Sequence, residues 1–446
     1  MVVSRDKTPT AQETFMQMAQ AAGLRGRLLV TIGLLILARF GVFLPVPGID
    51  RERFSADIQN SPVIGFLDIF SGGGLSALGI FALGILPYIN ASIILQLLTA
   101  AIPALENLQK NEGEAGRRKI SQITRYVALG WGVAQSIGIA LWVQRYATTP
   151  GSLFIAETAL ALTAGSIFVM WLSELITERG IGNGASLLIF VNIVAILPRT
   201  LGQTIELAQT GGRETVGKVV ILLLVFLIMI VGIVFVQEGT RRIPIITARR
   251  QVGRRLYRER TNYLPLRLNQ GGVMPIIFAS AVLILPASLA QFTGNSAQNG
   301  FFAPVNQTLV QISTYLSPNG PTPWLYVLVY LVLIVFFSYF YASLIINPVD
   351  MAQNLKKMGA SIPGIRPGRT TSEYVERVLN RLTFLGAIFL GLVAVVPTAV
   401  ESATGVTTFR GLGATSLLIL VGVAIDTAKQ IQTYVISQRY EGMVKQ

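Results

Sequence analysis

Two of the side chains that most often perform enzymatic chemistry are missing from this sequence, because its 446 residues include no cysteine and no histidine. The chain therefore has no thiolate nucleophile, no disulfide and no imidazole that could act as a base or bind a metal. Most metal sites, and most catalytic sites built on Ser/His or Cys/His, are excluded. We expect a protein without enzymatic activity, cofactor or metal.

One segment is similar to a phosphate-binding loop, the stretch GRETVGK at residues 212–218. Val219 stands where such a loop has the Ser or Thr that binds Mg²⁺. No strand is expected before the segment. A coincidental match is therefore the preferred interpretation.

The elements that would position any functional residue are apolar helices. Hydrophobic residues make up 52% of the chain and charged residues only 13%, whereas soluble domains carry about a quarter charged residues. A helix needs about 20 apolar residues to cross the hydrocarbon core. The first apolar segment is as long as a full span, so no cleaved signal peptide is expected. Ten segments qualify, the fifth and tenth being short: 28–47, 77–101, 126–143, 153–173, 185–198, 219–236, 271–292, 323–346, 382–400 and 412–428.

Acidic residues inside these segments are few, which disfavours a proton or ion relay. Glu157 and Glu174 lie at opposite ends of the fourth segment, and Asp426 lies near the end of the tenth. Arg39 is the one cation inside a segment, and we expect it to pair with a carbonyl or to reach toward the membrane surface. Energy for any transport is then expected to come from a partner.

The distribution of Lys and Arg predicts the orientation in the membrane, since these residues stay on the cytoplasmic side of short loops. With the N-terminus inside, the cytoplasmic segments hold 28 of the 36 Lys and Arg residues and the external segments hold 7, Arg39 being the last. Both termini are therefore predicted to be cytoplasmic.

A short repeat links the second and seventh segments. Residues 84–92 read GILPYINAS and residues 272–280 read GVMPIIFAS, with five identities at the same spacing. The two lie five spans apart, and because five is odd a true repeat would be inverted. Such repeats place a pathway near the midplane, at the interface of two halves. A chance match of two apolar segments that contain Gly and Pro stays an equal alternative.

Two predicted cytoplasmic loops are rich in basic residues. The loop at 237–269 holds nine arginines, and the loop at 347–381 holds six Lys and Arg residues. Setting the topology and touching anionic lipid headgroups would need only a few of them. Arg binds phosphate bidentately, so the excess also suits docking to an RNA-bearing or acidic partner. Both interpretations stay open.

The external segment 61–76 is apolar but too short to cross a membrane. Asp68 and three consecutive glycines at 72–74 indicate a small mobile element. An ordinary re-entrant loop and a plug are both compatible with this pattern.

Six stretches carry a resemblance to a known family. They are FSGGG from residue 70, FALGILPYINAS from 81, EGEAGRRKISQ from 112, ERGIGNG from 178, RRIPI from 241 and PGIRPG from 363. In this order they resemble the SecY family, the central subunits of the bacterial protein-conducting translocon. The resemblance runs from near Leu24 to near Tyr440. A bacterial source is implied, and a cyanobacterial or plastid-like one is a further hypothesis.

The resemblance implies an hourglass channel between two inverted, pseudo-symmetric five-helix halves. This channel would open sideways to lipid between spans two and three and spans seven and eight. Residues 61–76 would be the plug, whose members here are Phe66, Leu67, Asp68, Ile69, Phe70, Gly72, Gly73 and Gly74. A constriction ring would comprise Ile85, Ile89, Ala185, Ile189, Ile277 and Ile419. Ala185 departs from the usual Ile and implies a slightly wider or differently packed ring.

The resemblance also implies partners. SecE and SecG would be small membrane subunits, SecA or the ribosome would supply energy, and secretory preproteins with their signal peptides would be the cargo. Anionic lipids would touch the basic loops. Docking of SecA or of ribosomal RNA would use Arg241, Arg242, Arg249, Arg250 and Arg366.

The resemblance implies a gated channel for unfolded secretory polypeptides and for transmembrane segments released into lipid. The expected organisation is a cytoplasmic segment 1–27, halves at 28–200 and 201–433, and a tail at 434–446. The expected location is the bacterial inner membrane, and also the thylakoid membrane if the source is cyanobacterial. A secondary transporter for a small solute and a noncatalytic membrane scaffold are the rival hypotheses. The transporter needs a polar midplane site, and the scaffold explains the basic loops but not the repeat.

Overall fold

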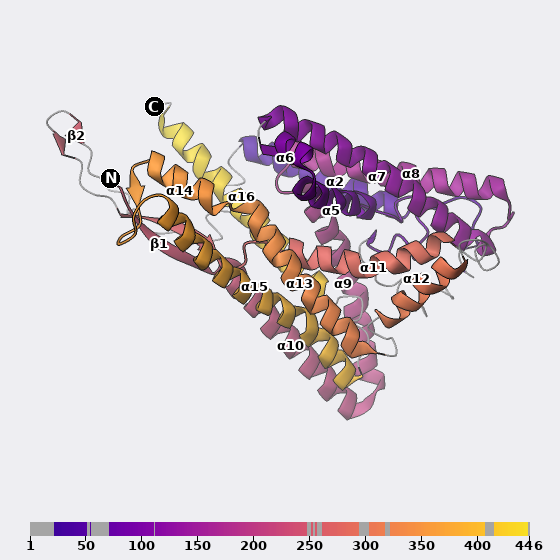
Figure 1. Ribbon diagram of the computed structural model, residues 1–446. Helices are drawn as coiled ribbons and strands as arrows, with labels where there is room; N and C mark the ends of the chain where they lie inside the picture. Colours follow the sequence, from indigo (N-terminus) through magenta and orange to yellow (C-terminus); the bar gives the residue numbers. More distant parts are fainter. Residues whose placement is uncertain are drawn as a thin grey trace. The chain divides into compact units, whose positions relative to one another are not determined.

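The computed structural model describes residues 22–50, 54, 71–110, 112–247, 251–252, 255–256, 261–293, 303–316, 322–405 and 414–444. Helices dominate these ranges (Figure 1). The α-helices are α2 (Ala22–Val42), α5 (Leu86–Ala101), α6 (Pro103–Lys110), α7 (Gly113–Val143), α8 (Ser152–Arg179), α9 (Gly184–Thr210), α10 (Gly212–Glu238), α11 (Met274–Thr293), α12 (Ala303–Tyr315), α13 (Pro323–Ile345), α14 (Pro348–Lys357), α15 (Arg369–Thr404) and α16 (Ala414–Val444). The strands are β1 (Thr240–Thr247), β2 (Gln251–Val252), β3 (Arg255–Leu256), β4 (Thr261–Arg267) and β5 (Ala360–Ser361).

Each of the ten predicted apolar segments falls on its own helix: α2, α5, α7, α8, α9, α10, α11, α13, α15 and α16. Within the described residues, six helices are long and apolar enough to cross a membrane, and α5 with α6, bent by 105°, could be a seventh span. Helix α2 misses that criterion because it carries three arginines in its 21 residues. The predicted fold class, a helical membrane protein, is confirmed.

Three predicted boundaries need correction. Residues 77–85 form turns, and α5 starts only at Leu86. Helix α9 runs through Pro198 to Thr210, and the Thr200 hydroxyl donates to the Leu197 carbonyl at 2.9 Å beside the proline. Helix α16 extends through most of the predicted tail, where Val435 is buried against Leu24 and Ile181.

The chain divides into two compact units. The first is Met1–Gln203, Ala287–Val310 and Val423–Gln446, and the second is Thr204–Pro286 and Gln311–Gly422. The predicted halves, divided at residue 200, stay a prediction.

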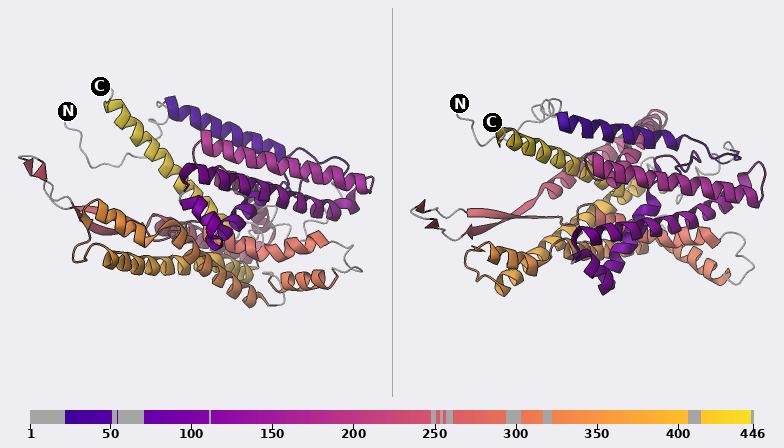
Figure 2. Two further views of the ribbon diagram at one scale, coloured as in Figure 1. Left: turned by 45° about the horizontal axis from the view of Figure 1, so that its top comes forward. Right: turned by 90° about the horizontal axis from the view of Figure 1, so that it is seen from above.

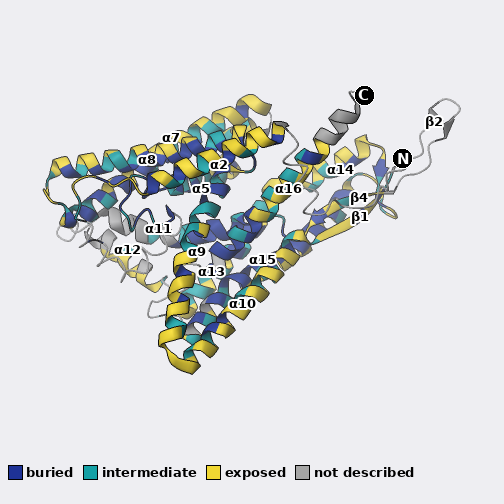
Figure 3. Cartoon of the chain, turned by 180° about the vertical axis from the view of Figure 1, so that it is seen from behind, coloured by how far each residue is buried: buried dark blue, intermediate teal, exposed yellow. Residues whose placement is uncertain are grey.

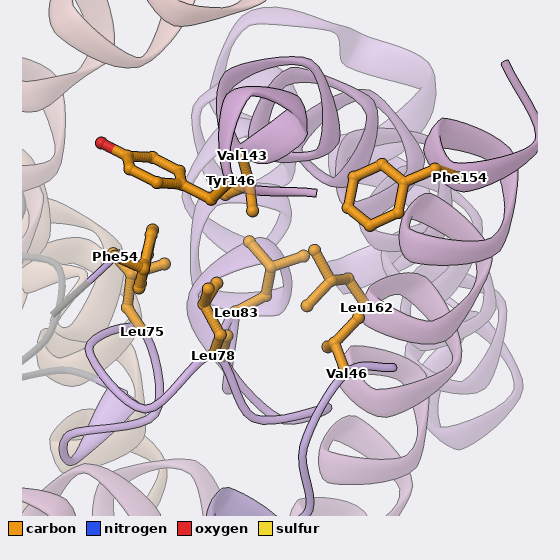
Figure 4. Packing of buried hydrophobic residues seen from close by; sticks show 10 residues of the cluster. Val46, Phe54, Leu75, Leu78, Leu83, Val143, Tyr146, Phe154 and Leu162 are labelled. Carbon is orange, nitrogen blue, oxygen red and sulfur yellow. The ribbon is translucent and has the colours of Figure 1, made fainter. Parts of the chain in front are cut away.

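In the first unit, α7 packs beside both α5 and α8, and α2 packs on α8 (Figure 1). A cluster of buried side chains at one end of these helices includes Leu75, Leu78 and Leu83 from the turns before α5 (Figure 4). The Phe54 ring stands edge-on to Trp142 and Tyr146, with centroids 5.5 and 5.3 Å apart. This cluster fixes the segment that leads into α5.

In the second unit, α10 and α13 both pack against α15. Leu227, Val231 and Phe235 on α10 are exposed at helical spacing, and α10 shows a long exposed face in Figure 3. An exposed apolar stripe on a helix of this length suits contact with lipid.

The second unit also holds a small sheet that the sequence pattern did not predict. Strands β4, β1 and β5 form it in that order, all antiparallel, and β1 and β4 run side by side as a ribbon (Figure 2). Ile243 and Leu266 from the ribbon are buried against Val375 and Leu379 of α15. The basic loops are therefore a folded element with a core of its own.

Candidate functional site

The start of α5 positions the first two predicted ring residues. Gly84 adopts a left-handed φ of +52°, which turns the chain into the helix, and Pro87 fits the first helical turn, where no amide partner is needed. The Ile89 amide donates to the Ile85 carbonyl at 3.1 Å. Ile85 is 1% exposed and Ile89 is 8% exposed, so the two lie one helical turn apart in buried positions.

The start of α11 has the same local structure. Gly272 has a φ of +58°, and Pro275 again lies in the first helical turn. The Ile277 amide donates to the Val273 carbonyl at 3.4 Å, at the same offset as in α5. Ile277 is 8% exposed, as Ile89 is. The sequence repeat is therefore matched by a repeated backbone conformation, which favours a true repeat over chance.

The N-terminus of α9 positions two further ring residues. The Asn183 side-chain oxygen accepts from the amides of Ala185 at 3.1 Å and Ser186 at 3.4 Å, an arrangement typical of a helix N-cap. Ala185 and Ile189 lie one turn apart on this helix, and Ile189 is buried. Ile419, on α16, is also buried. That all six residues form one ring stays a prediction.

The predicted plug is described only in its last part. Phe66, Leu67, Asp68, Ile69 and Phe70 lie outside the described residues. Residues 71–74, which we call the glycine turn, are described. Gly72 and Gly73 have left-handed φ values of +67° and +88°, and the Gly74 amide donates to the Ser71 carbonyl at 3.3 Å.

Arg39 binds this turn. A guanidinium nitrogen of Arg39 donates to the carbonyl of Gly72, and the guanidinium carbon lies 5.3 Å from the centroid of the Phe43 ring. The expectation that Arg39 pairs with a carbonyl is confirmed. Asn192 of α9 lies at the same place, because a Cβ on Gly72 would be 2.6 Å from its side-chain oxygen.

Sequence reasoning missed Asn192. The signal that could have found it is an amide side chain in an apolar segment, three residues after the ring position Ile189. The acid Glu174 also has a partner, since the Arg125 Nε donates to its carboxylate at 2.7 Å. This ion pair joins α7 to α8.

The predicted docking arginines lie on the small sheet and beside it. Arg241 and Arg242 of β1 are exposed, as is Arg366 in the turn after β5. Arg249 and Arg250 lie outside the described residues. Successive residues of a strand point to opposite faces. Arg242 therefore projects from the opposite face to the buried Ile243.

Comparison with known proteins identifies the family. A family model described as SecY matches residues 79–428. The protein translocase subunit SecY of Synechococcus elongatus is 76% identical over 449 residues, covering 100% of both chains. The subunit of the same name from Porphyra purpurea is 57% identical, covering 96% of this chain and 100% of the relative.

Solved structures agree in fold. One described as the structure of a protein conducting channel matches with a TM-score of 0.65 and 17% identity, over 96% of this chain and 94% of that one. Another, concerning the plug domain of the SecY protein, matches with a TM-score of 0.62 and 17% identity, over the same shares of the two chains. Together with the motifs and the full-length identity, these matches place the sequence in one family: the chain belongs to the SecY family.

Proposed function

We propose that this chain forms a channel that conducts unfolded secretory polypeptides across a membrane and releases transmembrane segments sideways into lipid. The observation that carries the proposal is the full-length 76% identity to a protein translocase subunit. The matched helix starts at Gly84 and Gly272 support it, since each places an isoleucine at the same buried position.

The proposed ring acts as an apolar collar. A narrow ring of aliphatic side chains blocks ions by excluding water rather than by charge. Aliphatic contacts are not directional, so such a collar can yield to a passing chain of almost any sequence. Ala185 removes volume from one of the six positions, which makes this collar wider or differently packed.

Energy and partners come from outside the chain. Arg241 and Arg242 are exposed on a folded sheet and Arg366 is exposed beside it, which suits docking of an anionic surface on SecA or on ribosomal RNA. SecE and SecG are the proposed membrane partners, and anionic lipids contact the basic loops. The proposed location is the bacterial inner membrane with both termini in the cytoplasm, and also the thylakoid membrane in a cyanobacterium.

Site-specific crosslinking tests the proposal. A photoreactive residue is placed at Ile89 or at Ile277 in membranes supplied with SecA, ATP and a stalled secretory chain. We expect crosslinks to the chain from both positions, and we expect them to disappear when the signal sequence is removed.

The matched control is Val231 on α10, an apolar residue that is 63% exposed. A photoreactive residue there should label lipid or neighbouring subunits but not the secretory chain. If the engaged chain crosslinks to neither isoleucine, the ring assignment is wrong. If the secretory chain crosslinks equally well to Val231, the crosslinks from Ile89 and Ile277 do not show that these residues line a pathway.

The rival functions make different predictions. A solute transporter would take up a labelled small solute when this chain alone is reconstituted, whereas a channel for polypeptides would not. A scaffold would dock cytoplasmic partners without forming a pathway. Deletion of residues 61–76 would then leave the membrane impermeable to ions. We expect ion leakage in that deletion variant.

A further inference from the structure

The glycine turn, residues 71–74, contains a buried peptide whose carbonyl is held by a cation. Gly72 is buried, and its oxygen accepts a hydrogen bond from the Arg39 guanidinium of α2. A buried carbonyl without a partner would destabilise the turn. An arginine inside a membrane-spanning segment is itself costly and is retained where it has a specific partner.

The space around Gly72 is closed by two polar side chains from different helices. A Cβ there would lie 2.5 Å from a guanidinium nitrogen of Arg39 and 2.6 Å from the side-chain oxygen of Asn192. The neighbouring Gly73 is different, because a Cβ there would meet nothing within 4 Å. Arg39 and Asn192 therefore enclose one peptide and leave the next one open.

The enclosed peptide belongs to a turn that is hydrogen-bonded to the residues that follow it. The Leu75 amide donates to the Ser71 hydroxyl at 3.0 Å, and the Gly79 amide donates to the Gly74 carbonyl at 2.9 Å. These bonds tie the turn to the segment that leads into α5. Asn192 lies three residues, or about one helical turn, beyond the ring position Ile189. One helix, α9, therefore carries both a residue that contacts Gly72 and a residue of the proposed ring.

We infer that Arg39 is a positioning residue of the channel: with Asn192 it clamps the Gly72 peptide and holds the glycine turn in the resting state. This inference rests on the proposed function. The resting and open states are in equilibrium, and a contact present in only one of them sets their ratio. Removing one charge-assisted hydrogen bond shifts such a ratio by about tenfold.

Conductance of the resting channel in planar bilayers tests the clamp, with the complete translocation complex and no precursor added. We expect Arg39→Gln to raise the resting ion conductance about tenfold, because it removes the charge-assisted bond. Arg39→Lys keeps a charged donor and should give a smaller rise. Both variants should still translocate a precursor when the motor and ATP are added.

Two glycine variants form the matched pair. Gly72→Ala and Gly73→Ala both place a side chain on a left-handed residue, which strains the backbone alike. Only Gly72→Ala also drives a methyl group into Arg39 and Asn192. We expect a clearly larger conductance for Gly72→Ala, and little further rise when Arg39→Gln is added to it, because both changes release one clamp.

The outcomes separate the clamp from the proposed function. Unchanged resting conductance in Arg39→Gln, with normal precursor translocation, overturns the clamp and leaves the channel function intact. Equal effects of the two glycine variants also overturn it, because backbone strain alone would then explain them. If Arg39→Gln fails to assemble, the glycine pair still decides. Absence of precursor translocation by the unaltered complex would instead contradict the proposed function.

Discussion

Whether a glycine of this chain can be replaced depends on which atoms lie close to the position of an added Cβ. A Cβ on Gly165 of α8 would meet the backbone carbonyl of Ile80, in the turns before α5. A Cβ on Gly202 of α9 would meet nothing within 4 Å. Composition treats the two residues alike, although one is a packing contact and the other is only a weak point in a helix.

We expect Gly165→Ala to destabilise the protein by about 1–3 kcal/mol, because the methyl group overpacks a backbone contact. The melting temperature of the purified protein in detergent measures this change.

Gly202→Ala is the control for this variant. It should leave the melting temperature unchanged or raise it, since alanine is favoured over glycine in a helix by up to about 1 kcal/mol. A lower melting temperature for Gly202→Ala than for Gly165→Ala would contradict the close approach at Ile80.

For Arg39, the sequence could predict which chemical group it would contact but not which residue supplies that group. The sequence indicated that Arg39 would pair with a carbonyl or reach toward the membrane surface, since a lone cation in an apolar helix needs an acceptor or water. The acceptor itself, Gly72, lies 33 residues away in the chain. Nothing local identifies such a partner, because the choice depends on how helices and turns pack.

At the scale of elements, the small sheet turns a basic loop into a defined surface. Strand β1 alternates between exposed and buried positions from Arg242 to Ile245, as a strand with one covered face does. Ile245 is buried with Leu355 and Ala360, which ties the ribbon to α14 and β5. Arg241 and Arg242 therefore stand on a sheet with a packed core.

We expect the double variant Arg241→Gln with Arg242→Gln to bind SecA or ribosomes about tenfold more weakly, since it removes charged hydrogen-bond donors. The loss should shrink at high salt, because salt screens exposed charges. Binding to the reconstituted protein at two ionic strengths measures both effects.

Leu266→Ala separates the charges from their support. Leu266 is 2% exposed in the core of the sheet, and its truncation should cost about 2–5 kcal/mol. We expect this variant to lose both binding and protection of β1 and β4 from amide hydrogen exchange. The arginine variant should lose binding only. Loss of exchange protection in the arginine variant would mean that the arginines stabilise the sheet instead of docking a partner.

At the scale of the whole molecule, the absence of cysteine from all 446 residues makes the orientation directly testable. Thr210 and Lys356 are both exposed and lie on predicted opposite sides of the membrane. We expect a membrane-impermeant maleimide to label Lys356→Cys from the cytoplasmic side and Thr210→Cys from the external side.

Intact cells and inverted membrane vesicles give the two sides of this measurement. The unaltered chain provides the background, because it has no thiol to label. Labelling of both cysteines from the same side would overturn the predicted orientation. That orientation depends on the uneven distribution of Lys and Arg between the loops.

The sequence alone determined that ten apolar helices form and which class of protein they build. Lipid cannot hydrogen-bond the backbone, so every apolar stretch of about 20 residues must be helical. The repeat was visible for a similar local reason, since Gly84 and Gly272 each precede a helix-starting proline by three residues. The exact first residue of α5 was not visible, because 77–85 is as apolar as the helix that follows.

Contacts between residues that are distant in the chain follow from how the helices and strands pack. The pairing of β1 with β4 and β5, the burial of Val435 against Leu24, and the clamp on Gly72 all join residues that are distant in sequence. Such contacts depend on side-chain shape and on the hydrogen-bonding needs of buried peptides in the packed state. Hydrophobic pattern and charge count carry no record of these properties, which is why the sequence did not show that Asn192 lies beside the glycine turn.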